Sequence, residues 1–461
     1  MKRLVIVIFI IFASFLTFSL YRTFAYDTSV VEETPSTTDL EYTFKIGNSS
    51  IKQITVDSGE TKYYDVVLGN PNLAKISYGV YYEMVSPSRN PDGFSIEYTS
   101  KSTGASTGKV DKEGNITLNL VVTNTSSSSV TVKLGTVAGY VNGGDLKLNS
   151  NQQFISKEPL PKATEVIKTL DDGTTGDSGS GVYKVHHEAI PANSSATGEI
   201  IEATDDYRYY GKNPNNYICL DKNSDNTCED RHLYRIIGSM REDSDNIYKL
   251  KVIKATPLIS NINSNYAWDT NGSNIWATNS NSLTSGSSLM IMLNSGAWWN
   301  KTGEFENYGF ENNVKNFISK SRYYLGGFHK GVLLTDKRYL LERGTISNPL
   351  YWNGYVGLLY PSDYGYASGK KCYSEKNLSM NRGNYTCYQN YWLITSEYFS
   401  EYAISPSVDD SYVFNTMDGK TVNDDGTASE SSIRPTFYLK PEVVITGGTG
   451  EETNPYTVSI E

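Results

Sequence analysis

The sequence predicts a mainly β and α+β protein with two folded domains. Its 461 residues exceed what one core usually organises, since domains commonly hold about 100 to 200 residues. Short apolar runs with a period of two recur along the chain, separated by Gly, Asn, Pro and Ser, which is typical of antiparallel sheets. We therefore expect an N-terminal signal or anchor segment, an Ig-like antiparallel β-sandwich, a linker and a C-terminal α+β domain.

The first 25 residues have the pattern of a secretory signal peptide. Lys2 and Arg3 precede the unbroken apolar run 4–18, and Ala25 follows at a position suited to cleavage. If it is not cleaved, the segment serves as an N-terminal anchor, and we expect membrane contact only through it. Residues 26–39 are polar and lack periodicity, which predicts a disordered spacer. The chain is thus expected to be secreted or held at the cell surface.

Residues 40–155 carry the pattern of the β-sandwich. About seven short alternating runs follow one another at hairpin spacing. In the run 116–122, Ile116, Leu118, Leu120 and Val122 alternate with more polar residues, which predicts one buried face. Residues 156–204 are rich in turn formers and predict a linker, with a short helix over 163–170 and a strand over 182–187.

Residues 205–461 are expected to form the second domain, closed by the strand 433–439. Ile433 and Phe437 fall on one face of this strand and Arg434 and Tyr438 on the other, the period of a half-buried strand. Its expected partner is the strand 233–240. Further strands are predicted at 217–220, 248–255, 355–360, 391–395 and 412–415, helices at 288–293 and 311–319, and a hairpin turn at Asp418-Gly419.

Charge and cysteine content limit the class of partner and the compartment. The net charge of -10 and the absence of any basic run oppose a nucleic-acid partner, because phosphate binding needs clustered Lys and Arg. Four cysteines in an exported chain favour two disulfides, although three pairings are possible. The turn-rich segments between neighbours predict Cys219 with Cys228 and Cys372 with Cys387.

Several short motifs suggest chemistry but have simpler interpretations. Asp221, Asn223 and Asp225 give the alternating oxygens of a calcium loop, yet Asn226 replaces its turn glycine and His232 its final glutamate. A polar loop closed by a disulfide is therefore favoured, and no metal site or cofactor is expected. His186 and His187 point to opposite faces of a strand and are predicted to be surface histidines. GDSGSG at 176–181 lacks any upstream histidine, so no catalytic residue is predicted.

The densest aromatic series of the chain lies between Tyr351 and Tyr402. Part of it must form core, and the rest is available for recognition, because Tyr and Trp give large contact area at low entropic cost. Both uses remain open. The predicted ligand-binding residues are Tyr364, Tyr366, Tyr373, Tyr385 and Tyr388, with Asp363, Asn384 and Asn390 as hydrogen-bonding groups.

Five stretches of the second domain resemble an uncharacterised family of exported proteins of Gram-positive bacteria. They are YRYYGKNPNNYICL, LYRIIG, YAWD, VGLLYPSDYGYASG and IRPTFYLKPEVVITGGTGEETNPYTV, in that order, and the sandwich is similar to the domain that commonly precedes them. Because no activity is established for that family, the resemblance implies no catalytic residue. The layout, with terminal strands paired around a long loop-rich middle, is also similar to C-type-lectin-like domains and the formylglycine-generating fold.

These features together favour a surface-associated binding or adhesion protein. A glycan is the first expected ligand and a host or cell-surface protein the second. The alternative is structural, a subunit of a surface filament or layer. A secreted enzyme comes third, since nucleophile, base and orienting residue are not recognisable together.

Overall fold

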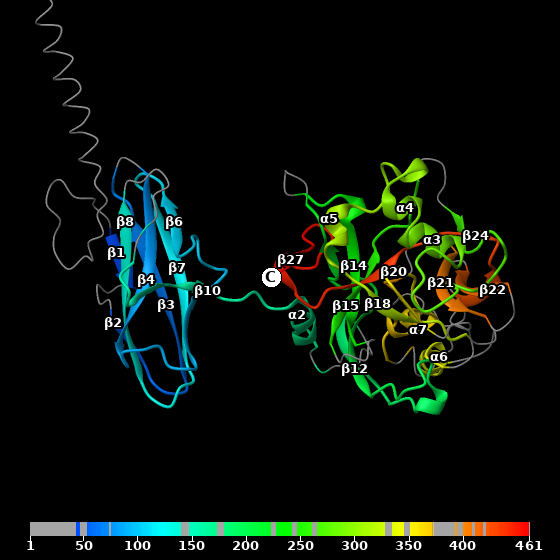
Figure 1. Cartoon of the computed structure of the whole chain (residues 1–461), viewed down its shortest axis with the longest axis horizontal. Helices are drawn as coiled ribbons and strands as arrows, with labels where there is room; N and C mark the ends of the chain where they lie inside the picture. The colour runs from blue at the N-terminus through cyan, green and yellow to red at the C-terminus, as the bar shows by residue number, and fades with distance from the viewer. Residues whose placement is uncertain are drawn as a thin grey trace, which may run out of the picture. The chain divides into compact units, whose positions relative to one another are not determined.

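The chain divides into two compact units, Met1–Leu160 and Pro161–Glu461. The computed structural model describes residues 43–46, 53–72, 75–139, 146, 148–171, 173, 179–222, 227–241, 247–260, 265–327, 334–344, 351–370, 372, 392–393, 400–407, 411–417 and 421–460. Strands predominate in both units (Figure 1), which confirms the mainly β prediction. The predicted N-terminal segment and spacer lie outside the described residues.

The first unit consists of two five-stranded sheets. The order in the first sheet is β1 (Thr43–Ile46), β3 (Glu60–Gly69), β7 (Asn115–Asn124), β5 (Phe94–Tyr98) and β10 (Ser156–Lys157). The second has the order β2 (Gln53–Val56), β8 (Val130–Gly139), β4 (Ile76–Ser86) and β6 (Thr107–Val110), with β9 (Gln152–Phe154) also paired to β4.

One hydrophobic core fills the space between these two sheets. Leu118 and Leu120 of β7 belong to it, as do Val80 of β4 and Val132 of β8. Along β7 the side chains alternate as predicted, with 116, 118, 120 and 122 buried and the residues between them partly exposed. Burying one such aliphatic side chain contributes about 1.5–3 kcal/mol, so the alternation fixes which face of each strand turns inward.

A ten-stranded sheet forms the centre of the second unit. Its main path runs β17 (Ile318–Ser319), β25 (Thr436–Leu439), β15 (Lys249–Lys254), β14 (Leu233–Met240), β13 (Tyr217–Cys219), β27 (Tyr456–Ile460) and β26 (Val443–Gly447). Off this path, β12 (Thr204–Tyr210) pairs with β14 and β11 (Gly181–His187), and β20 (Val356–Gly357) pairs with β25. β13 and β27 are parallel neighbours, so strands from both ends of the unit meet.

The closing strand differs from its prediction in two respects. β25 pairs with β15 rather than with β14, so the predicted partner lies one strand further away. Residues 433–439 are also buried on both faces, because helices and loops cover the side predicted to be exposed. Pro435 precedes β25, where its missing amide hydrogen removes no ladder hydrogen bond, and its carbonyl accepts from the Lys254 amide.

The segment predicted as a linker contributes structure to the second unit. The expected helix is α2 (Ala163–Thr169), whose Ile167 is fully buried in the core of this unit. The expected strand is β11, which pairs with β12 over seven residues from Gly181 to His187. Both elements lie in a stretch rich in turn-forming residues. For that reason the sequence predicted a linker, although the apolar residues of the two elements attach them to the sheet.

Shorter elements complete the second unit. The small strands are β16 (Tyr266–Ala267), β18 (Ser321–Tyr324), β19 (Tyr351–Gly354), β21 (Glu401–Pro406), β22 (Tyr412–Met417), β23 (Thr421–Gly426) and β24 (Glu430–Ser431). The helices are α3 (Ser288–Asn294), α4 (Ala297–Asn300), α5 (Asn312–Lys315), α6 (Thr335–Glu342) and α7 (Pro361–Tyr366), with 3-10 turns η1 (Ala192–Ser194), η2 (Asp230–His232) and η3 (Gly303–Phe305). The helix predicted at 288–293 and the pairing of β22 with β23 are confirmed. The helix predicted at 311–319 is shorter than expected, since α5 ends at Lys315 and Ile318 joins β17.

Candidate functional site

Three of the predicted ligand-binding residues lie on α7, and the structure buries all of them. Asp363, Tyr364 and Tyr366 are 1%, 2% and 0% exposed, so their prediction as exposed ligand contacts is wrong. For these residues the packing interpretation of the aromatic series holds. The other predicted residues lie outside the described residues: Tyr373, Tyr385, Tyr388, Asn384 and Asn390.

The start of α7 explains why Asp363 turns inward. Pro361 occupies the first turn, where its missing amide hydrogen costs nothing. The Asp363 carboxylate accepts a hydrogen bond from the Tyr360 amide at 3.0 Å, which satisfies one of the free donors of the helix start. Gly365 then permits the close approach of α6, because a Cβ there would lie 2.0 Å from Thr335 Oγ1. The helix is therefore held against the sheet with its carboxylate buried.

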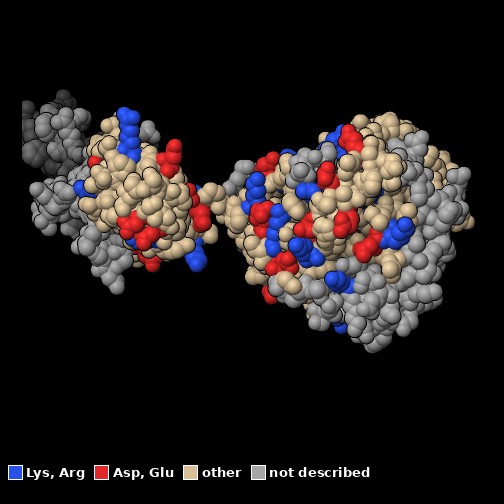
Figure 2. All heavy atoms as spheres, turned by 90° about the horizontal axis from the view of Figure 1, so that it is seen from below, with Lys and Arg blue, Asp and Glu red and all other residues tan. Residues whose placement is uncertain are grey.

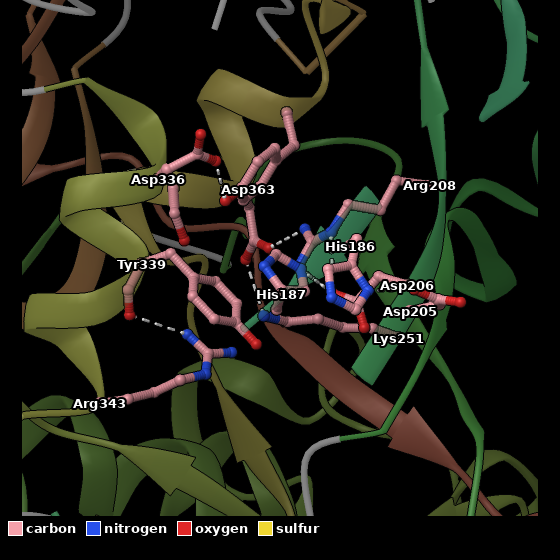
Figure 3. A network of polar contacts seen from close by, with 12 residues as sticks. His186, His187, Asp205, Asp206, Arg208, Lys251, Asp336, Tyr339, Arg343 and Asp363 are labelled. Atoms are coloured by element: carbon pink, nitrogen blue, oxygen red, sulfur yellow. Dashed lines mark hydrogen bonds and ion pairs between the residues drawn. The ribbon is translucent and has the colours of Figure 1, made fainter. Parts of the chain in front are cut away.

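Asp363 is the centre of a buried network of charges (Figure 3). Arg208 of β12 donates from one terminal nitrogen to Asp363 Oδ1 at 2.8 Å and from the other to Asp206 Oδ2 at 2.7 Å. Lys251 of β15 donates to Asp363 Oδ2 at 2.7 Å. Two cations thus face two carboxylates, and α7 is tied to strands that lie more than a hundred residues away in the sequence.

The cations keep both carboxylates ionised. Burial alone raises the pKa of Asp363, but Lys251 and Arg208 outweigh it and hold the pKa below its ordinary value. Burial likewise raises the pKa of Asp206, and the combined effects of Arg208 and His187 lower it overall. Such carboxylates are weak bases with their oxygens already engaged. The network is therefore suited to fixing the position of chain segments rather than to taking up protons at neutral pH.

His187 extends the network and corrects a prediction. It is 6% exposed rather than a surface residue, and its Nε2 lies 3.0 Å from Asp206 Oδ2. Its ring stacks on Tyr339 of α6 with 3.7 Å between centroids. His186, by contrast, is exposed as predicted and pairs with Asp205 at 2.7 Å. The two rings do point to opposite faces of β11, and α6 covers the face that holds His187.

We expect His187 to make the stability of the second unit depend on pH. Burial lowers the pKa of His187 below its ordinary value of 6.5, and this outweighs the opposite effect of Asp206. Below about pH 6.5 the unfolded chain therefore binds a proton that the folded chain does not, so stability present above that pH is lost as the pH falls through the folded pKa. Glu342 changes stability in the opposite direction: burial raises its pKa to about 7, so the folded chain binds a proton there more readily than the unfolded chain as the pH falls.

The comparison of His187→Gln with the wild type isolates this contribution. Urea unfolding is followed by tryptophan fluorescence, because all six tryptophans lie in the second unit. The variant should lose less stability than the wild type between about pH 7 and pH 5.5. Equal losses in both proteins would contradict the assignment, whatever the slope contributed by Glu342.

Two further arginines hold the chain on the C-terminal side of residues 373–391. Arg235 donates to the Trp392 carbonyl at 3.1 Å, and Arg434 donates to the Leu393 carbonyl. The Trp392 indole donates in turn to the Tyr209 carbonyl at 3.0 Å. Trp392 and Leu393 are buried, and so is Cys372 on the N-terminal side. The described residues on both sides of this segment are thus fixed in the core.

The structure confirms one predicted disulfide. Cys219 is bonded to Cys228, with 6.0 Å between their Cα atoms. Cys387, the predicted partner of Cys372, lies outside the described residues, so the second bridge stays a prediction. The same holds for the calcium loop: Asp221 accepts from Asn313 at 3.3 Å, but Asn223 and Asp225 lie outside the described residues.

Comparison with known proteins does not assign the chain to a family. No protein-family model matches the chain, and no curated protein matches it. Within the described residues, no helix is both long enough and apolar enough to cross a membrane.

Sequence reasoning missed the charged residues that organise this site. They are Asp206, Arg208, Lys251 and His187 around Asp363, and Arg434 with Glu401, whose carboxylate accepts from the Arg434 Nε at 2.6 Å. One signal was present: each is a charged or titratable residue inside or beside a run of aromatic and aliphatic residues, as in DDYRYY and IRPTFYL. Long charged side chains are almost never fully buried unless they are paired, so burial of one implies a partner.

Proposed function

We propose that this chain is an extracytoplasmic, surface-associated binding or adhesion protein whose second unit carries recognition. The observation that carries the proposal is the burial of Cys372 before residues 373–391 and of Trp392 and Leu393 after them. The sequence between these anchors holds Tyr373, Tyr385 and Tyr388. A segment attached to the core at both ends loses less conformational freedom when it binds, which favours recognition.

Other features of the second unit support the proposal. On the face of the larger unit in Figure 2, Lys and Arg lie interspersed with Asp and Glu, a mixed surface that suits a glycan or protein better than a polyanion. The pairing of β13 with β27 brings strands from both ends of the unit together, as expected for a lectin-like layout. The Cys219–Cys228 disulfide suits an exported protein.

Array binding with matched tyrosine variants tests the proposal. The purified chain is applied to glycan and cell-surface protein arrays as wild type, Tyr385→Ala and Tyr388→Ala. We expect both variants to lose binding at an unchanged melting temperature. Tyr63→Ala, which removes a tyrosine that is 76% exposed on the first unit, is the control and should bind like the wild type.

Two outcomes would contradict this function. Loss of binding in Tyr63→Ala but in neither of the other variants would move recognition to the first unit. Concentration-dependent fibres without array binding would favour the structural alternative, a filament or layer subunit. A secreted enzyme is the third possibility.

A further inference from the structure

Two buried guanidinium groups lie on one face of the central sheet, apart from the network around Asp363. Arg235 of β14 pairs in register with Ile253, and Ile253 pairs with Thr436 of β25. Arg434 comes two residues before Thr436, and alternate residues of an extended chain share a face. The two arginines are 6% and 2% exposed and donate to the consecutive carbonyls of Trp392 and Leu393. They are therefore close neighbours in the core.

Each guanidinium is held firmly, yet each keeps one nitrogen unused. Arg434 donates to both oxygens of Glu401, at 2.6 and 2.9 Å. Arg235 donates to Asn216 Oδ1 at 2.8 Å, and its Cζ lies 4.5 Å from the ring centroids of both Tyr217 and Trp392. Among the described residues, NH2 of Arg235 and NH1 of Arg434 have no hydrogen-bond partner, although both atoms are buried.

The two arginines differ in their ion pairs. Within the described part of the chain, Glu401 forms an ion pair with Arg434, whereas no carboxylate forms one with Arg235. Around Asp363 two carboxylates face two cations, so the same unit provides an internal comparison. Burial lowers the pKa of Arg235 to about 10, which still leaves it charged at neutral pH; Arg434 adds to that shift, while Tyr217 and the Glu452 carboxylate act against it. An unpaired buried charge is costly, so a counter-anion would stabilise it.

We infer that Arg235 and Arg434 form a binding site for the carboxylate of a ligand. The unused nitrogens of the two guanidinium groups match the two oxygens of one carboxylate, and a guanidinium edge donates well to such planar oxygens. The inference rests on the proposed function, because it names the ligand chemistry for recognition beside the anchors Trp392 and Leu393. An acidic sugar and a peptide-type C-terminus both present this group, and the experiment separates them.

The test uses the purified full chain with four sodium salts and one neutral sugar. Melting temperature is followed by tryptophan fluorescence in acetate, D-glucuronate, N-acetylglycinate or chloride at equal ionic strength, and in D-glucose. We expect the carboxylates to raise the melting temperature above its value in chloride, and glucose to leave it unchanged. A larger shift with glucuronate indicates an acidic sugar, and a larger shift with N-acetylglycinate indicates a peptide carboxylate.

Titration calorimetry of two variants assigns the site. Arg235→Gln removes the guanidinium that has no ion pair and should weaken carboxylate binding at least tenfold. Arg231→Gln removes an exposed arginine of the same unit and should bind like the wild type. Carboxylate shifts no larger than that of chloride in the wild type, or full binding by a folded Arg235→Gln, would overturn the inference. The salt comparison needs only the wild type, so it decides the matter even if the variant does not fold.

The carboxylate experiments and the array experiment test the two proposals separately. If the arrays show binding that depends on Tyr385 and Tyr388 while carboxylates have no effect, the carboxylate site is wrong and recognition by the second unit stands. If carboxylates bind through Arg235 while the arrays show nothing, the carboxylate site stands and the tyrosine-based recognition is wrong.

Discussion

The substitution Asp363→Asn is expected to lower the free energy of unfolding of the second unit by about 3–5 kcal/mol. It removes the charge that Arg208 and Lys251 share, and both cations remain buried, at 1% and 0% exposed. Removing one member of a buried pair costs far more than the pair itself contributes, because the remaining charge stays out of water. Urea unfolding followed by tryptophan fluorescence measures the change in this unit.

Asp205→Asn is the matched control for this prediction. Asp205 pairs with His186 and Lys184 at the surface, where its side chain is 32% exposed, and such pairs contribute about 0–1 kcal/mol. The double variant Asp363→Asn with Lys251→Met should be less destabilised than the sum of the two single variants, since it also removes the lysine charge that pairs with Asp363. If Asp363→Asn cost no more than Asp205→Asn, the buried network would not stabilise the fold.

The substitution Tyr366→Ala is expected to destabilise the second unit by about 3–5 kcal/mol, the range for truncating a buried aromatic side chain. The ring is fully buried, lies 4.7 Å from Arg208 Cζ and packs edge-on against Tyr339. Its hydroxyl donates to Asp336 at 2.7 Å. A cavity, a lost cation–π contact and an unpaired Asp336 oxygen act in the same direction.

Two variants give this prediction its controls. Tyr308→Ala truncates a tyrosine that is 39% exposed and should change stability by less than about 1 kcal/mol. Tyr366→Phe keeps the ring and should cost only about 0.5–1.5 kcal/mol for the hydrogen bond to Asp336. If Tyr366→Ala melted like the wild type but lost a ligand, Tyr366 would be a recognition residue and the packing interpretation would be wrong.

The sequence by itself determined the local elements and the choice of inward face where one face of a strand meets water. In β7 the alternation of Ile116, Leu118 and Leu120 with polar residues is reproduced, because the residues between them stay partly exposed to water. The helix α3 and the β22–β23 hairpin were predictable for the same reason, since their signals lie within a few residues. The Cys219–Cys228 bridge closes a short turn-rich loop and is local too.

Only the tertiary structure decided which charged residues are buried and which strands are neighbours. Lys251 lies in KLKVIK, where lysines alternate with apolar residues as on an exposed face, yet α7 covers that face and supplies Asp363 as its partner. Tyr364 and Tyr366 belong to the same helix and are buried with it, and the position of β15 between β14 and β25 is likewise set by distant contacts. The alternation of residue types along a strand shows that its two faces differ. What lies against each face depends on segments more than a hundred residues away, and no local pattern carries that information.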